Sequence, residues 1–182
     1  MKEISADKNY IKTHSRRYLR TLDFVNSLNI KSNKILDLGP LNPLSNLLRE
    51  NGYNITNTKE FQDLDNDYEI VKQSGFDVVT AFEIIEHLVS PYPLLKSIAA
   101  NKLIISVPLK LWFANAYWSE KDPFDRHYHE FEPKQLHMLL NKAGWKVVKE
   151  EKWTSHSFQL GIRPILRMFV PRHYIVYCER IK

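Results

Sequence analysis

Short, mostly apolar runs alternate along the chain with stretches in which apolar residues recur at helical spacing. The runs occupy residues 35–38, 76–82 and 103–107. Runs of this length and composition are typical of strands buried on both faces of a parallel sheet. Helical patterns open at Pro43 and Pro91, so strands and helices alternate. The alternation predicts an α/β fold built on a doubly wound, mostly parallel sheet.

The first apolar run leads into a tight turn and a helix. Gly39 follows where the chain must turn, Asn42 is a suitable N-cap, and Pro43 suits the first helical position,. A glycine at position 52 ends the helical pattern,. In open α/β sheets, a strand followed by a turn and a helix N-terminus builds a small-molecule crevice at the carboxyl ends of the strands.

Further elements flank this central pattern. Residues 8–29 predict an amphipathic helix with Tyr18, Leu22 and Val25 on one stripe,. That helix would pack on the sheet or, alternatively, cover a ligand. Additional strands are predicted at 53–58, 145–151 and 174–178, a helix at 133–143, and an irregular connection at 158–170. We find no repeat and no linker, which indicates a single domain over residues 1–182.

Two stretches depart from the regular alternation. Residues 60–69 are rich in acids, and only about 17 residues separate the strand at 53–58 from the next one, so any element between them must be abbreviated. Residues 109–131, the aromatic insertion, combine seven Trp, Tyr and Phe side chains with several charged ones. A connection of this length inside a compact domain is usually functional.

Charge and composition exclude several broad classes. The chain carries a net charge of +5, concentrated in its two ends. No stretch combines dense Lys/Arg with spaced aromatics, so nucleic-acid binding is not expected. One cysteine, Cys178, and no membrane-spanning apolar run favour a cytoplasmic protein,. The apolar and basic stretch at 162–172 leaves peripheral contact with an anionic membrane open.

Several chemistries lack their motifs. The chain has no phosphate-cradling Gly-x-x-x-x-Gly-Lys-Ser/Thr, no Gly-x-Gly-x-x-Gly after the first strand, and no Gly-x-Ser-x-Gly elbow,. His127 and His129 lie close to Glu130 and are possible metal ligands. Because no third spaced ligand set accompanies them, the sequence predicts no metal site.

Four segments, taken together and in order, resemble a known family. Lys34-Ile-Leu-Asp-Leu-Gly39 resembles the first motif of class I S-adenosylmethionine-dependent methyltransferases. Residues 76–88, which contain Glu83-x-x-Glu86-His87-Leu, resemble the fourth-strand motif. Residues 103–108 resemble the fifth strand, and residues 129–145 resemble the segment that leads into the sixth strand. The resemblance implies the Rossmann-like methyltransferase fold of seven strands, with the last strand antiparallel.

The resemblance also implies S-adenosylmethionine as cofactor and assigns residues to it. Asp37 would hold the methionyl amino group directly or through water, and the backbone of Gly39 and Pro40 would lie under the donor. The backbone of Phe82 and Glu83 would meet its methionyl end. The implied activity is methyl transfer to a small-molecule acceptor, with the aromatic insertion facing that acceptor.

The sequence departs from the family pattern at two places. Leu41 and Pro43 stand where further glycines are usual, which indicates a stiffer loop. The position of the usual ribose-binding acid falls on Lys59, so Glu60, Asp63 and Asp65 are the candidates for that role. These departures leave a second hypothesis open, in which the protein keeps the fold as a binding or scaffold protein without catalysis.

A general base is needed only if the acceptor must lose its proton early. His127 and His129 are the favoured candidates because they lie in the aromatic insertion. Glu86 and His87 are interpreted as structural residues that orient the helix after the fourth-strand motif.

Overall fold

A computed structural model describes residues 8–120, 122, 125–155 and 161–181 of the 182-residue chain. The strands are β1 (Lys34–Asp37), β2 (Asn54–Asn57), β3 (Val78–Phe82), β4 (Lys102–Pro108), β5 (Trp145–Thr154) and β6 (Pro171–Arg180). The α-helices are α1 (Lys8–Asn26), α2 (Pro43–Glu50), α3 (Pro91–Ser97), α4 (Pro133–Lys142) and α5 (Ile162–Phe169). Two short 3-10 helices, η1 (Glu69–Lys72) and η2 (Ile85–His87), complete the described elements.

The strands form one sheet in the order β2-β1-β3-β4-β6-β5. The pairs β1–β2, β1–β3 and β3–β4 are parallel, whereas β6 is antiparallel to both β4 and β5. The mostly parallel α/β sheet with an antiparallel last strand is therefore confirmed. The expected count of seven strands is wrong for the described residues, which form six. The short acid-rich segment between β2 and β3 forms turns and η1 in place of a strand.

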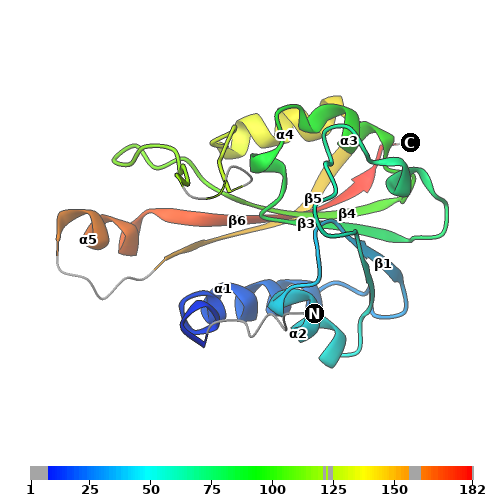
Figure 1. Cartoon of the computed structure of the whole chain (residues 1–182), viewed down its shortest axis with the longest axis horizontal. Coiled ribbons are helices and arrows are strands. Elements are labelled where there is room, and N and C mark those ends of the chain that lie inside the picture. Colours follow the sequence, from blue (N-terminus) through cyan, green and yellow to red (C-terminus); the bar gives the residue numbers. More distant parts are fainter. Residues whose placement is uncertain (1–7, 121, 123–124, 156–160, 182) are drawn as a thin grey trace.

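Helices cover both faces of the sheet (Figure 1). Helices α1 and α2 lie on one face, and α3 and α4 lie on the other, whereas α5 projects beyond one end of the sheet. Two separate apolar clusters fill the two layers. The larger cluster includes Leu95, Leu136 and Trp145, and the smaller one includes Leu22 and Leu48. Burial of these continuous apolar surfaces is the main favourable term that holds the layers together.

The local predictions around the first strand are confirmed. The Asn42 side chain accepts hydrogen bonds from the backbone N–H groups of Leu44 and Ser45, and Pro43 occupies the first helical position. Gly52 adopts a φ of +88°, as the end of α2 requires,. The N-terminal helix also forms, but it ends at Asn26 rather than at 29.

The prediction for residues 158–170 is corrected in part. Residues 162–169 form α5 rather than an irregular connection, and residues 156–160 lie outside the described part of the chain. Within the described residues, no helix combines the length and the apolar character that crossing a bilayer would require.

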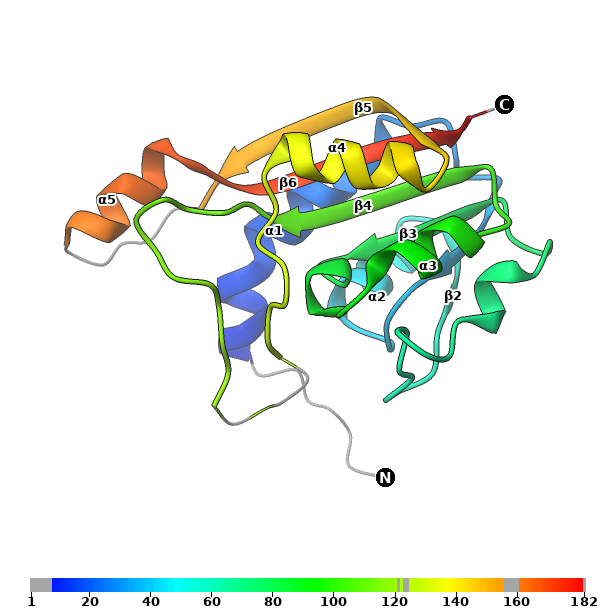
Figure 2. The ribbon, with the colours of Figure 1, turned by 90° about the horizontal axis from the view of Figure 1, so that it is seen from above.

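The aromatic insertion follows β4 and precedes α4, at the end of the sheet where β6 begins (Figure 2). Its first residue pairs with the start of β6, because the Leu109 N–H donates to the Arg172 carbonyl. Its two ends also meet, since the Lys110 N–H donates to the Phe131 carbonyl 2.9 Å away. The insertion is thus closed at its base and held at the carboxyl end of β4.

Candidate functional site

The topology places a switch point at the carboxyl end of β1,. From β1 the chain runs outward to β2 and then crosses to β3 on the other side of β1. In open α/β sheets, ligands bind at such switch points, where neighbouring connections leave in opposite directions. The turns after β1, β2 and β3 all meet at this edge, and they carry most of the residues that the sequence analysis selected.

Asp37 ends β1 and is only 2% exposed. Its carboxylate accepts hydrogen bonds from Thr80 Oγ1 (2.6 Å), Ser45 Oγ (2.8 Å) and Asn57 Nδ2 (3.0 Å). Burial raises the pKa of Asp37 to about 6, although the three donors act in the opposite direction,. Asp37 therefore links the ends of β1 and β2 to the middle of β3 and to the first turn of α2. Its binding of the methionyl amino group stays a prediction.

The turn after β1 contains fewer glycines than the family pattern, and hydrogen bonds from the end of β2 hold it. The Gly39 N–H donates to Thr58 Oγ1 at 2.7 Å, and Asn57 Nδ2 donates to the Gly39 carbonyl at 3.3 Å. Gly39 has a φ of +123°, and a Cβ at this position would come within 3.2 Å of Ile84 Cδ1. Asn57 and Thr58 were not selected from the sequence, because a polar pair after a strand carries no distinctive signal.

The three candidates for the ribose-binding acid differ in their contacts. Asp65 accepts hydrogen bonds from the backbone N–H groups of Val89 and Ser90, and Asp63 accepts hydrogen bonds from the Asp65 N–H and the Asn66 side chain. Both therefore stabilise turns of the chain. Glu60 is exposed and makes no hydrogen bond or ion pair with the described residues. Of the three, Glu60 has the carboxylate with most freedom to bind a ligand.

Glu83 follows Phe82 at the end of β3 and has a φ of +55°, unusual for a residue with a side chain,. Its carboxylate accepts hydrogen bonds from Arg17 Nη1 on α1 at 2.9 Å and from Ser106 Oγ on β4 at 3.0 Å. Burial alone would raise the pKa of Glu83, but Arg17 and other nearby groups hold it below its usual value. Arg17 was not predicted to reach the strand ends.

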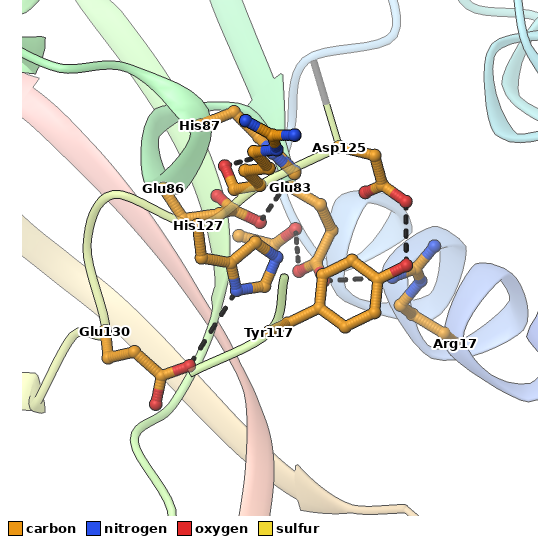
Figure 3. Close-up of polar contacts among 10 residues, drawn as sticks. Arg17, Glu83, Glu86, His87, Tyr117, Asp125, His127 and Glu130 are labelled. Atoms are coloured by element: carbon orange, nitrogen blue, oxygen red, sulfur yellow. Dashed lines mark hydrogen bonds and ion pairs between the residues drawn. The ribbon is translucent and has the colours of Figure 1, made fainter. Parts of the chain in front are cut away.

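Glu86, His87 and His127 come together beside Glu83, as Figure 3 shows. The Glu86 side chain is 1% exposed, and Glu86 Oε1 lies 3.9 Å from His87 Nε2. The rings of His87 and His127 meet edge to face, with 4.8 Å between their centroids. Burial, followed by the nearby Glu83, raises the pKa of Glu86 well above its usual value, whereas burial and His87 lower the pKa of His127 to about 4.

His129, the second histidine selected from the sequence, lies outside this group. Its Nε2 is 3.2 Å from the Val89 carbonyl oxygen, and its ring stacks on Phe131. These contacts fix the course of the insertion. A catalytic role for His127 or His129 stays a prediction, and the geometry favours His127.

A cavity of about 300 Å³ lies at the base of the aromatic insertion. One side is formed by the aromatic insertion, including Tyr117, Trp118 and Glu130, and another by Arg167 and Arg172. The Tyr117 ring lies 5.2 Å from the His127 ring, and Glu130 Oε1 lies 3.9 Å from His127 Nδ1. The cavity therefore combines aromatic surface with two cationic side chains at the same edge of the sheet.

A β1–β3 switch point with carboxylates at the ends of both strands is the arrangement at which doubly wound α/β proteins bind ligands,. The family of methyltransferase domains matches residues 10–150, so the chain belongs to this family. The resemblance seen in the sequence is thereby confirmed. No curated protein matches the chain significantly.

Solved structures share the fold at low sequence identity. A chain in the complex of the Haloferax volcanii Trm112 methyltransferase activator with a methyltransferase aligns with a TM-score of 0.68 at 11% identity, over 98% of this chain and 96% of that one. An S-adenosylmethionine-dependent methyltransferase from Mesorhizobium loti aligns with a TM-score of 0.61 at 13% identity, over 92% of this chain and 98% of that one.

A third structure contains two bound small molecules. The Burkholderia thailandensis 1,6-didemethyltoxoflavin-N1-methyltransferase, with bound 1,6-didemethyltoxoflavin and S-adenosylhomocysteine, aligns with a TM-score of 0.57 at 15% identity, over 93% of this chain and 91% of that one. These structures show that the chain shares the fold of S-adenosylmethionine-dependent methyltransferases. Nothing in these comparisons supports the scaffold hypothesis.

Proposed function

We propose that this protein transfers the methyl group of S-adenosylmethionine to a small-molecule acceptor bound against the aromatic insertion. The single observation that carries the proposal is the meeting of the turns after β1, β2 and β3 at the switch point,. The cavity of about 300 Å³ lies at the carboxyl end of β4 and is lined by the insertion. Membership of the methyltransferase family supplies the chemistry that this geometry supports.

The residues at this edge fit a cationic donor that carries ribose hydroxyls. Asp37 and Glu83 place two carboxylates at the ends of β1 and β3, and a carboxylate favours a nearby sulfonium or ammonium group,. The exposed Glu60, beyond the end of β2, can accept two hydroxyl hydrogen bonds,. Gly39 has no Cβ, so no side-chain atom of residue 39 crowds Ile84 or the space beside the turn after β1.

When bound, S-adenosylmethionine supplies an electrophilic methyl carbon on a sulfonium. In-line displacement at such a carbon depends mainly on holding the acceptor in position. The insertion and the arginines around the cavity would perform this task, and Arg167 and Arg172 favour an acceptor with an anionic group,. His127 contacts Tyr117 and Glu130 of the cavity lining, and burial and His87 lower its pKa to about 4, so its neutral imidazole has a lone pair available for a proton or for another ligand,.

Calorimetric titration of the full chain with S-adenosylmethionine, S-adenosylhomocysteine and NAD tests the proposal. We expect micromolar binding of the first two and none of NAD. Glu60→Ala should weaken binding by about 10-fold or more, because it removes charge-assisted hydrogen bonds. The matched variant Asp67→Ala, an exposed acid on the same segment, should bind as the wild type does.

No binding of either compound to a cooperatively melting protein would overturn the proposal. If Glu60→Ala binds S-adenosylmethionine with wild-type affinity, the cofactor assignment is kept and only the ribose-binding role of Glu60 is contradicted.

A further inference from the structure

Glu86 is a buried acid whose carboxylate oxygens have no hydrogen-bond partner among the described residues. The residue is 0% exposed, and neither carboxylate oxygen has a hydrogen-bond partner within the described chain. An unpartnered buried carboxylate is strongly unfavourable unless it is neutralised by a proton or by a cation. Glu83, three residues earlier, does not solve this problem, because it is itself an acid and is already bound to Arg17 and Ser106.

His87 presents a lone pair to this acid. Its Nδ1 lies 3.1 Å from the Arg126 carbonyl oxygen, which can only accept, so Nδ1 carries the proton,. In a neutral imidazole the lone pair is then on Nε2, the atom 3.9 Å from Glu86 Oε1. A backbone carbonyl that fixes the tautomer of a histidine in this way is the usual outer contact of a metal-binding imidazole.

The aromatic insertion brings the second histidine to the same place. The backbone N–H groups of Tyr128 and His129 donate to the Glu86 carbonyl oxygen at 2.8 and 3.2 Å. Together with the contact between His87 and Arg126, these bonds hold the insertion on both sides of His127. His127 Nδ1 is buried and also lacks a hydrogen-bond partner within the described chain.

From these contacts we propose that Glu86, His87 and His127 form a binding site for a divalent transition-metal ion. One donor atom from each residue lies within 4.8 Å of the others. Donors around one ion, at about 2.0–2.2 Å from it, lie about 3–3.5 Å apart, so small side-chain rotations complete the site. Two imidazoles with one carboxylate favour Mn²⁺, Fe²⁺, Co²⁺ or Zn²⁺ over Mg²⁺ or Ca²⁺.

Three protein donors leave coordination positions for an exogenous ligand. Tyr117 and Glu130, which line the cavity, also contact His127, so the ion would lie beside the cavity proposed for the acceptor. This placement rests on the proposed function, whereas metal binding itself does not.

Metal binding is tested on the full chain without S-adenosylmethionine. Protein freed of metal with a chelator is titrated with MnCl₂, ZnCl₂ and MgCl₂, with calorimetry for all three and electron paramagnetic resonance for Mn²⁺. We expect one Mn²⁺ or Zn²⁺ per chain, weaker binding of Mg²⁺, and a rise of the melting temperature with metal concentration. Glu86→Gln and His127→Gln should each weaken Mn²⁺ binding by at least about 10-fold.

His137→Gln is the matched control, because His137 lies on α4 and contacts Glu150 and Tyr174 instead. It should bind Mn²⁺ as the wild type does. If either site variant fails to melt cooperatively, His87→Asn replaces it in the comparison. Absence of saturable binding to the wild type, or equal binding in Glu86→Gln, would overturn the proposal and indicate a proton on Glu86. Neither result changes the cofactor titration, so the two proposals fail separately.

Discussion

The turns after β1 and β3 contrast in how their buried polar atoms are satisfied. Asp37, at the end of β1, has three side-chain donors on its carboxylate. Glu86, after β3, is equally buried and has none within the described chain. Leaving a buried polar group unpaired costs about 1–3 kcal/mol, and more for a charged group. Folding alone therefore satisfies the carboxylate of Asp37 in the first turn, whereas the carboxylate of Glu86 in the second turn is suited to bind a ligand.

The largest expected effect comes from breaking the completed turn. Asp37→Ala leaves the donors of Thr80, Ser45 and Asn57 without their common acceptor, so the free energy of unfolding should fall by about 3–4 kcal/mol. Urea unfolding followed by circular dichroism measures this change, with Asp67→Ala as a surface control. A loss below about 1 kcal/mol would show that the three donors find other partners.

The protonation of Asp37 provides a second way to probe the same turn. Its pKa is about 6 in the folded chain against an ordinary value of 3.8, so the folded state binds the proton more tightly. The resulting stabilisation is fully present below pH 3.8 and is lost as the pH rises through about 6,. The loss should be on the order of 3 kcal/mol, at 1.36 kcal/mol per pKa unit.

Urea unfolding between pH 3 and 7 measures this dependence as the difference between wild type and Asp37→Asn, which cannot titrate. Parallel curves for the two proteins would contradict a raised pKa at Asp37.

A smaller effect is expected from removing Asn57, which holds the glycine-poor turn after β1. Asn57→Ala removes the hydrogen bonds to Asp37 and to the Gly39 carbonyl and should cost about 1–2 kcal/mol of unfolding free energy,. It should also weaken S-adenosylmethionine binding measured by calorimetry, because the loop under the donor loses its anchor. An unchanged affinity would show that Pro40 and Pro43 hold the loop without Asn57.

The smallest effect is expected in the turn after β3, which carries Glu86. Glu86→Gln keeps the shape of the side chain and removes an acid that has no hydrogen-bond partner among the described residues. The free energy of unfolding of the metal-free protein should therefore change by less than about 1 kcal/mol,. Thermal melting in the presence of a chelator measures this. A loss as large as that of Asp37→Ala would remove the contrast between the two turns.

Periodicity predicted most of the fold because the strands are buried on both faces. The runs that became β1, β3 and β4 are nearly continuous in apolar residues, and the Asn42-Pro43 pair marks the start of α2. The missing strand was harder to predict. The sequence showed that the segment between β2 and β3 is short, but the family resemblance favoured seven strands over that signal. Helix α5 was missed because Gly161 and Pro164 suggested irregular structure.

The site was predicted less completely than the fold. Asp37 ends a strand, and Gly39 and Glu83 follow strands, so their position at the strand ends could be read from the sequence. The partners Arg17, Asn57 and Thr80 come from three other elements, and only the tertiary arrangement brings them together. For the same reason the sequence paired His127 with His129, its neighbour in the chain. The fold instead places His127 beside His87, which is 40 positions earlier in the sequence.

The loss of the seventh strand makes β2 an edge of the sheet, where unpaired backbone groups could recruit another chain,. β2 limits this hazard by its length of four residues and by exposed polar side chains at Asn54 and Thr56. β5, the opposite edge, has ten residues but carries charged side chains and a bulge between Val147 and Lys149,. Both borders of the shortened sheet are therefore protected against strand addition, so a smaller sheet does not become a template for aggregation.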